Sequence, residues 1–150
     1  MVDLSTQYLG MKLKNPVIAG SSGLTNSVKS IQDLEKSGAG AVVLKSIFEE
    51  EIAFEYEDIL KEASAEGVNL DQFDYYDFHI KGEKLDKYTS LIEESKKSVS
   101  IPVIASINCV YSHEWTSFAK QLQTAGADAL ELNMFFLPSD FDRTSEEKEK

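Results

Sequence analysis

The sequence is poor in cysteine and proline, and it contains no long run of apolar residues. The single cysteine, Cys109, excludes an intrachain disulfide and a thiolate cluster, and we expect no metal site. None of the apolar runs approaches the ~18 residues that a membrane span needs. The first ten residues lack the basic region and the apolar core of a signal peptide. We therefore expect a cytoplasmic protein without a membrane partner.

Positive charge is also scarce. The chain has 15 lysine and arginine residues against 26 aspartate and glutamate residues, a formal net charge of -11. This balance argues against electrostatic binding to nucleic acid or to anionic membranes. Half of the acidic residues lie between Glu49 and Asp86, which is typical of a solvated face. The 150 residues are 42% hydrophobic, a composition that fits one globular domain.

Two segments share one order of elements: "SIQDLEKSGAGAVVLKS" and "SFAKQLQTAGADALELN" each read as a helix, a glycine and a strand. Gly38 and Gly126 suit the left-handed conformation that closes a helix. A further strand precedes each helix, and both of these strands contain Pro-Val-Ile-Ala, at 16–19 and 102–105. Alternation of this kind predicts parallel strands joined by helical crossovers.

The expected fold class is therefore α/β. Four such strands with their helices make about the N-terminal half of a (β/α)8 TIM barrel, preceded by a β-hairpin that turns at Gly10-Met11. Asn26 or Ser27 can cap the first helix, and another helix is expected from about Lys84 to Lys97. We interpret 47–83 as a long insertion after the second barrel strand. A four-stranded flavodoxin-like sheet is the alternative, although no Gly-rich phosphate loop follows a strand.

Polar groups follow each predicted strand at its carboxyl end, where parallel α/β folds gather their sites. Small residues let a flat ligand approach the main chain, a lysine can stabilise negative charge on a ring, and an asparagine both donates and accepts hydrogen bonds. The pattern predicts a planar, polar-edged cofactor that lies across the mouth of the barrel. The same residues could instead only cap strands and form turns. They are Gly20-Ser21-Ser22-Gly23, Lys45-Ser46, Ser106 to Asn108, and Asn133.

Four motifs carry a family resemblance. "NPVIAGSSG", "VVLKS", "IPVIASI" and "GADALELN" together resemble the flavin-binding barrel of dihydroorotate dehydrogenases. The run "ASINCVYSHEWTSFAKQLQTAGADALELN" is also similar to the pyrimidine-reducing barrel domain of dihydropyrimidine dehydrogenase. The resemblance covers most of the chain outside about 47–83. It implies that residues 1–150 form the N-terminal half of a single FMN-binding barrel domain.

The resemblance also implies an FMN-dependent oxidoreductase acting on CH–CH bonds, with a dihydropyrimidine-type small molecule as substrate. Asn133 matches the first residue of the family's Asn-Leu-Ser-Cys-Pro motif and would hold the substrate pyrimidine. Lys45 matches the lysine placed near the flavin ring and the substrate. The residues expected to bind the cofactor are Gly20, Ser21, Ser22, Lys45, Ser46 and Asn108.

The acid/base side departs from the family. The family places a Cys or Ser three residues after the motif asparagine, where it takes a proton while the flavin takes a hydride. Here that position is Phe136, which cannot move a proton. The catalytic base is therefore unknown. Lys45 is one candidate by its position, and the further candidates by residue type or nearness are Ser139, His113 and His79.

Two other functions remain open from the sequence. One is a non-redox TIM-barrel protein with a binding or structural role, and the other is an aldolase that uses Lys45 as a Schiff base. Barrels of this kind grip phosphate with loops after strands seven and eight. We therefore expect the 150-residue chain alone to bind FMN poorly. Two half-barrels could associate as a homodimer to cover their strand edges.

Overall fold

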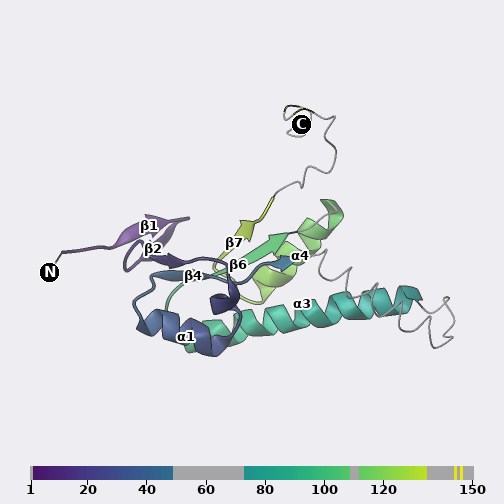
Figure 1. Ribbon diagram of the computed structural model, residues 1–150, viewed down its shortest axis with the longest axis horizontal. Helices are drawn as coiled ribbons and strands as arrows, with labels where there is room; N and C mark the ends of the chain where they lie inside the picture. The colour runs from purple at the N-terminus through teal and green to yellow at the C-terminus, as the bar shows by residue number, and fades with distance from the viewer. Residues whose placement is uncertain (1, 49–72, 109–111, 135–143, 145, 147–150) are drawn as a thin grey trace.

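The protein is described by a computed structural model. Residues 73–83 and 112–114 are described by their backbone alone, and the described parts of the chain are 2–48, 73–108, 112–134, 144 and 146. They form a short hairpin, a parallel sheet and three α-helices (Figure 1). In these parts of the chain, no helix is both long enough and apolar enough to cross a membrane.

The expected hairpin precedes the sheet. Strands β1 (Thr6–Tyr8) and β2 (Met11–Leu13) pair antiparallel. Leu9 and Gly10 join them with φ of 50° and 77°, and positive φ at both positions matches the right-handed twist of a hairpin. The hairpin is confirmed, and its turn lies one residue earlier than expected.

Within the described residues the sheet is fully parallel and has four lanes, where a lane is one strand position across the sheet. β4 and β5 both pair with the same edge of β6, because β7 takes the other edge over the residues between them. The lanes therefore follow one another in the order of the chain: β3, then β4 with β5, then β6, then β7. The strands are β3 (Ile18–Ala19), β4 (Ala41–Val43), β5 (Ile47–Phe48), β6 (Val103–Asn108) and β7 (Ala129–Leu132).

The second lane contains a β-bulge between β4 and β5. Val43 pairs with Ile104, and Ile47 pairs with Ile107, so four steps along this lane match three steps along β6. One extra residue is therefore inserted, and the alternation of side chains between the two faces shifts by one. Leu44 and Ile47 accordingly both lie in the core cluster, although they are three positions apart in the chain.

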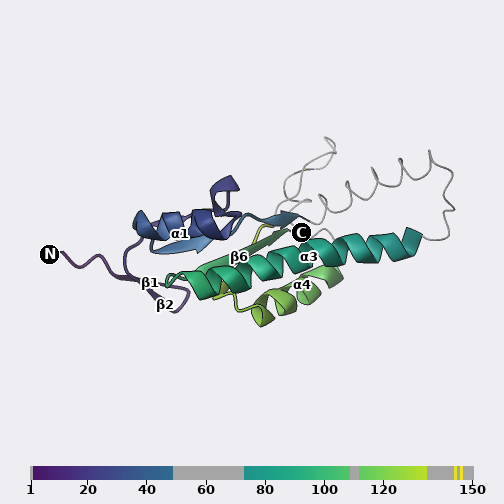
Figure 2. The ribbon, with the colours of Figure 1, turned by 90° about the horizontal axis from the view of Figure 1, so that it is seen from below.

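All three described α-helices pack on one face of this sheet, where they lie side by side (Figure 2). In a doubly wound fold the helices cover both faces, and the strand order is not that of the chain. Sequential lanes with helices on one face are instead compatible with part of a TIM barrel. The helices are α1 (Val28–Lys36), α3 (Phe73–Ser98) and α4 (Ser112–Thr124), and a 3-10 turn, η1 (Gly23–Thr25), precedes α1.

The helix ends follow the sequence closely. The Ser27 side chain accepts a hydrogen bond from the Ser30 N–H and caps α1, as expected. Gly38 and Gly126 have φ of 104° and 95°, and both end their helix in the same pair of backbone hydrogen bonds. In each, the glycine N–H bonds the third carbonyl before it, and the next N–H bonds the fifth before it. The two predicted units therefore enter the sheet in the same way.

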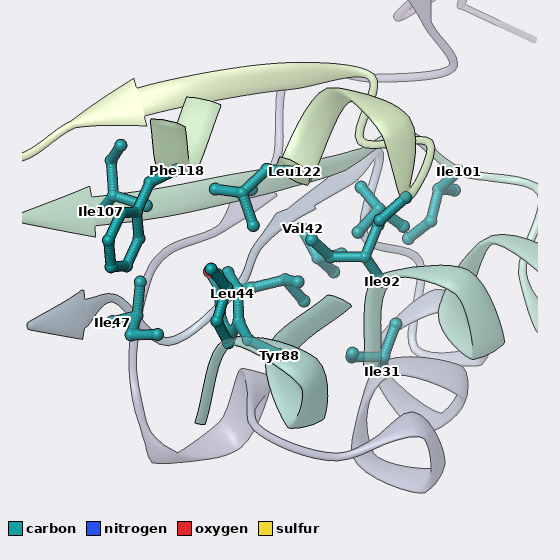
Figure 3. Close-up of a cluster of buried hydrophobic side chains, with 14 of the residues drawn as sticks. Ile31, Val42, Leu44, Ile47, Tyr88, Ile92, Ile101, Ile107, Phe118 and Leu122 are labelled. Carbon is teal, nitrogen blue, oxygen red and sulfur yellow. The ribbon is translucent and has the colours of Figure 1, made fainter. Parts of the chain in front are cut away.

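The core lies between the helices and the sheet. Figure 3 shows side chains from all three helices meeting alternate residues of the strands. Ile31 of α1, Ile92 of α3 and Leu122 of α4 are almost fully buried there. Ser106 and Ile104 fall between the core residues of β6 in the alternation and therefore face the opposite side. This second face carries the polar residues of the site.

One expectation about the insertion is wrong. We expected the helix after the insertion to start near Lys84, but α3 begins at Phe73, and Ile47–Phe48 at the start of the insertion forms β5. A helix that has formed extends at little further cost, so the stretch before Lys84 continues it although it lacks a clear apolar stripe. Residues 49–72 of the insertion lie outside the described part.

Candidate functional site

A cavity of about 560 Å³ opens where the strands end. It is flanked by the segment after β3, the bulge and the end of β7. Five of its lining residues were expected at the site from the sequence: Ser21, Ser22, Lys45, Ser46 and Asn133. The other three are Phe48, Glu131 and Leu132.

Gly20 lies next to this cavity, directly after β3. A Cβ atom built on Gly20 would meet no other atom within 4 Å, so its main chain borders open space. A flat ring can therefore approach the backbone here, as the sequence pattern predicted. Asn15, at the opposite end of the sheet, donates to the Gly38 carbonyl, so the hairpin lies away from the cavity.

Asn108 takes a supporting position. Its side chain is buried, and its Nδ2 donates a hydrogen bond of 2.6 Å to the Asn133 carbonyl. The Asn133 N–H in turn donates to the Ile107 carbonyl. The main chain of Asn133 is thus fixed from both sides, and its side chain is left to the cavity. The expected contact of Asn108 with a cofactor stays a prediction.

A hydrogen-bonded chain of three serine hydroxyls and one carboxylate crosses all four lanes beneath the cavity. Ser21 Oγ lies 3.1 Å from Ser46 Oγ, and Ser46 Oγ lies 2.7 Å from Ser106 Oγ. Ser106 Oγ donates to Glu131 Oε1 at 2.7 Å. Because the Ser106 proton goes to Glu131, Ser46 donates to Ser106. Since the single hydroxyl proton of Ser46 goes to Ser106, Ser21 donates to Ser46 Oγ, and Ser21 Oγ accepts from the Ser46 N–H at 2.9 Å.

The sequence analysis missed Glu131. The strand "ALEL" was read as an apolar run that ends in Asn133. The available signal was alternation, because residues two apart on a strand share a face. Glu131 therefore points to the same side as Asn133, one level deeper in the sheet.

Tyr88 of α3 supports the site from the core side. Its hydroxyl accepts a hydrogen bond of 3.0 Å from the Ser106 N–H and donates one of 3.1 Å to the Ser106 carbonyl. These backbone groups face the bulge, where the ladder to the neighbouring lane is interrupted. Burial raises the pKa of Tyr88 to about 12, and the negative charge of Glu131 adds to this, while the backbone hydrogen bond of Ser106 opposes it.

Lys45 lies between two cavities. It lines the site cavity and a second cavity of about 290 Å³ on the side of α3, together with Ser46. The Lys45 N–H donates to the Thr25 carbonyl at 3.3 Å, which ties the bulge to η1. The lysine therefore rests on a fixed main chain within the bulge between β4 and β5.

Phe136, which stands at the family's acid/base position, the candidate Ser139 and the single cysteine Cys109 lie outside the described residues. His79 and His113 lie in α3 and α4, where only the backbone is described. Among the described residues, no group of three or more His, Cys, Asp and Glu side chains could hold a metal ion.

Comparison with known proteins bears out the family resemblance. No family model matches the sequence. The chain is 30% identical over 141 residues to the catalytic subunit of dihydroorotate dehydrogenase B (NAD(+)) from Thermoplasma acidophilum, covering 89% of this chain and 42% of that protein. The corresponding subunit from Thermoplasma volcanium gives the same identity and coverage.

A second group of relatives has a related name. The chain is 28% identical over 134 residues to the NAD-dependent dihydropyrimidine dehydrogenase subunit PreA of Escherichia coli K12, covering 87% of this chain and 32% of that protein. The homologues of most of this chain are thus dehydrogenases named for pyrimidine-related substrates. The chain spans less than half the length of each.

Proposed function

We propose that this chain is half of an FMN-dependent oxidoreductase that transfers a hydride between the flavin and a dihydropyrimidine-type substrate. One observation carries the proposal. Residues of three strand ends, which the family resemblance assigns to cofactor and substrate, line a single cavity. Relatives named as dihydroorotate and dihydropyrimidine dehydrogenases, about 30% identical over most of the chain, support it.

The residues present fit a flavin. The cavity volume of about 560 Å³ lies within the range of small-molecule sites, roughly 300–1,000 Å³. The open main chain at Gly20 admits a flat ring, and the hydroxyls of Ser21 and Ser22 offer hydrogen bonds at its edge. A bound flavin would supply the hydride chemistry. Lys45 would place a positive charge near the ring.

The substrate would be oriented by Asn133. Its amide can donate and accept at the edge of a pyrimidine, and Asn108 and Ile107 hold its main chain in place. Phe136 stands where the family has its proton-transferring Cys or Ser. We therefore propose that the proton leaves through a group other than residue 136, and that Lys45 is a candidate.

A closed barrel requires further strands. Among the described residues, the outer edges of β3 and β7 pair with no other strand. We propose that a complementary half-barrel covers both edges, supplied by a longer chain or by a second copy. Light scattering of the purified protein decides between them, because a homodimer has twice the mass of the chain.

The test is the visible absorption spectrum of the complete protein that carries this chain, after free flavin is removed. We expect a flavin band, and release of FMN on denaturation. A colourless protein that also ignores added FMN would refute the proposal and favour a non-redox barrel. Borohydride trapping of a carbonyl compound on Lys45 would instead indicate an aldolase.

A further inference from the structure

The level directly beneath the cavity is polar. In TIM barrels the interior is usually filled by layers of bulky branched side chains, contributed by alternate strands. Here Ser21, Ser46, Ser106 and Glu131 form one hydrogen-bonded layer that reaches across all four lanes. We call these four residues the polar layer. Apolar packing does not require them, so their presence calls for another role.

The hydrogen bonds of the polar layer share one direction. Ser21 donates to Ser46, Ser46 donates to Ser106, and Ser106 donates to the Glu131 carboxylate at 2.7 Å. Hydrogen bonds to a charged acceptor are stronger than neutral ones. The Ser106 main chain is itself fixed by the buried Tyr88 hydroxyl. The carboxylate is therefore held in one place.

Two opposite charges line the cavity. Among the described residues that line it, Glu131 is the one carboxylate and Lys45 is the one cation. A cation and an anion on different strand ends act in opposite senses on any ring that gains or loses charge between them. In a closed barrel the remaining strands would cover this face, which is exposed at Glu131 in the present chain. Less water would then screen the two charges.

We propose that Glu131, fixed by the polar layer, lowers the reduction potential of the flavin bound in the cavity. The inference rests on the proposed function. A flavin that accepts two electrons and one proton becomes an anion. A fixed carboxylate nearby opposes this gain of charge, whereas Lys45 favours it. A lower potential makes the reduced flavin a better hydride donor, so the site would favour reduction of an unsaturated pyrimidine-type ring.

The effect is large enough to measure. Two unit charges about 10 Å apart, at the effective dielectric constant of about 20 found near protein surfaces, interact enough to change an equilibrium by about tenfold or more. Removal of the Glu131 charge should therefore favour reduced over oxidised flavin by about tenfold. For a two-electron couple this is a rise of about 30 mV.

The experiment measures the flavin potential of the complete protein by equilibration with a reference dye. We expect Glu131→Gln to raise the potential, Glu131→Asp to keep it close to that of the unchanged protein, and Lys45→Met to lower it. Glu93→Gln is the matched control. Glu93 lies exposed on α3 beside Lys97, and its substitution removes the same charge away from the cavity. This control should leave the potential unchanged.

The outcomes separate the two proposals. A complete protein that binds no FMN overturns the proposed function and this inference with it. FMN bound at an unchanged potential in Glu131→Gln, or shifted equally in Glu93→Gln, overturns this inference alone. Should Glu131→Gln fail to fold or to hold flavin, Ser106→Ala replaces it. Loss of the Ser106 hydroxyl releases the carboxylate and should raise the potential by a smaller amount, and no change would again refute the inference.

Discussion

Replacement of Tyr88 by phenylalanine removes one oxygen atom from the contact between α3 and β6. The Tyr88 hydroxyl is the partner of both the Ser106 N–H, at 3.0 Å, and the Ser106 carbonyl, at 3.1 Å. The side chain is 9% exposed, so water cannot readily replace the oxygen. Both backbone groups would therefore lose their hydrogen bonds inside the protein.

The expected cost follows from these two bonds. A buried polar group without a partner costs about 1–3 kcal/mol, and two such groups share one site here. We expect Tyr88→Phe to lower the free energy of unfolding by about 2–4 kcal/mol. This is a large share of the total stability of a typical domain, about 5–15 kcal/mol. Denaturant unfolding followed by circular dichroism measures the change.

The pH dependence gives a second signature. Burial raises the pKa of Tyr88 to about 12, above the usual value of about 10, so the neutral hydroxyl is favoured more in the folded state than in the unfolded chain. Its contribution to stability is fully present below about pH 10 and is lost as the pH rises toward 12, because only the unfolded chain then releases the proton. The loss approaches about 1.4 kcal/mol per pH unit. The stability difference between the protein and Tyr88→Phe should therefore narrow between pH 10 and 11.

The matched control is Tyr8→Phe, because Tyr8 is 45% exposed in the hairpin. We expect it to change the stability by less than about 0.5 kcal/mol. Equal stability of Tyr88→Phe and the unchanged protein would refute the assigned hydrogen bonds. A constant difference between pH 9 and 11 would refute the raised pKa.

Two further changes test the packing of the sheet. Gly40→Ala should destabilise the protein by about 1–3 kcal/mol, because its new Cβ would overlap the Asn15 carbonyl oxygen. The control Gly23→Ala, whose Cβ meets no atom within 4 Å, should lower the stability far less. Equal denaturation midpoints of the two variants would contradict the reasoning. Asp128→Ala should cost about 1–3 kcal/mol in the same assay, since Asp128 Oδ2 accepts from the Val103 N–H at 2.7 Å and pairs with Lys96 at 2.7 Å. Lys96→Met should cost less than about 1 kcal/mol, and a larger loss than for Asp128→Ala would show that the ion pair matters more than the backbone contact.

Local sequence signals predicted the repeated unit well. Gly38 and Gly126 end their helices with positive φ, and Ser27 caps α1, because each of these conformations depends on a few neighbouring residues. Lys45 and Asn133 line one cavity near the carboxyl end of the sheet. This follows from the parallel arrangement alone, since parallel strands all end on one edge of the sheet.

The remaining features depend on contacts between distant segments. The role of Glu131 depends on its hydrogen bond with Ser106, which lies 25 residues earlier in the chain. The role of Tyr88 depends on its hydrogen bond with the backbone of Ser106, in a strand distant in sequence. The bulge after Val43 has no local marker, because the register of β5 is set by its partner β6. The early start of α3 at Phe73 was missed for a different reason, since its first turns lack the apolar period of a surface helix.

The extra residue in the second lane has a consequence for the history of this protein. An insertion within a buried strand normally disrupts its packing, because every later side chain moves to the other face of the sheet. Here the change of phase brings Ser46 and Phe48 to the cavity and keeps Ile47 in the core. Without one residue between Leu44 and Ser46 the lane would alternate regularly and Ser46 would still face the cavity, so the bulge is what accommodates the extra residue. A gap at this point of an alignment should therefore mark relatives whose second lane has no bulge but keeps the places of Ser46 and Phe48 on the cavity side.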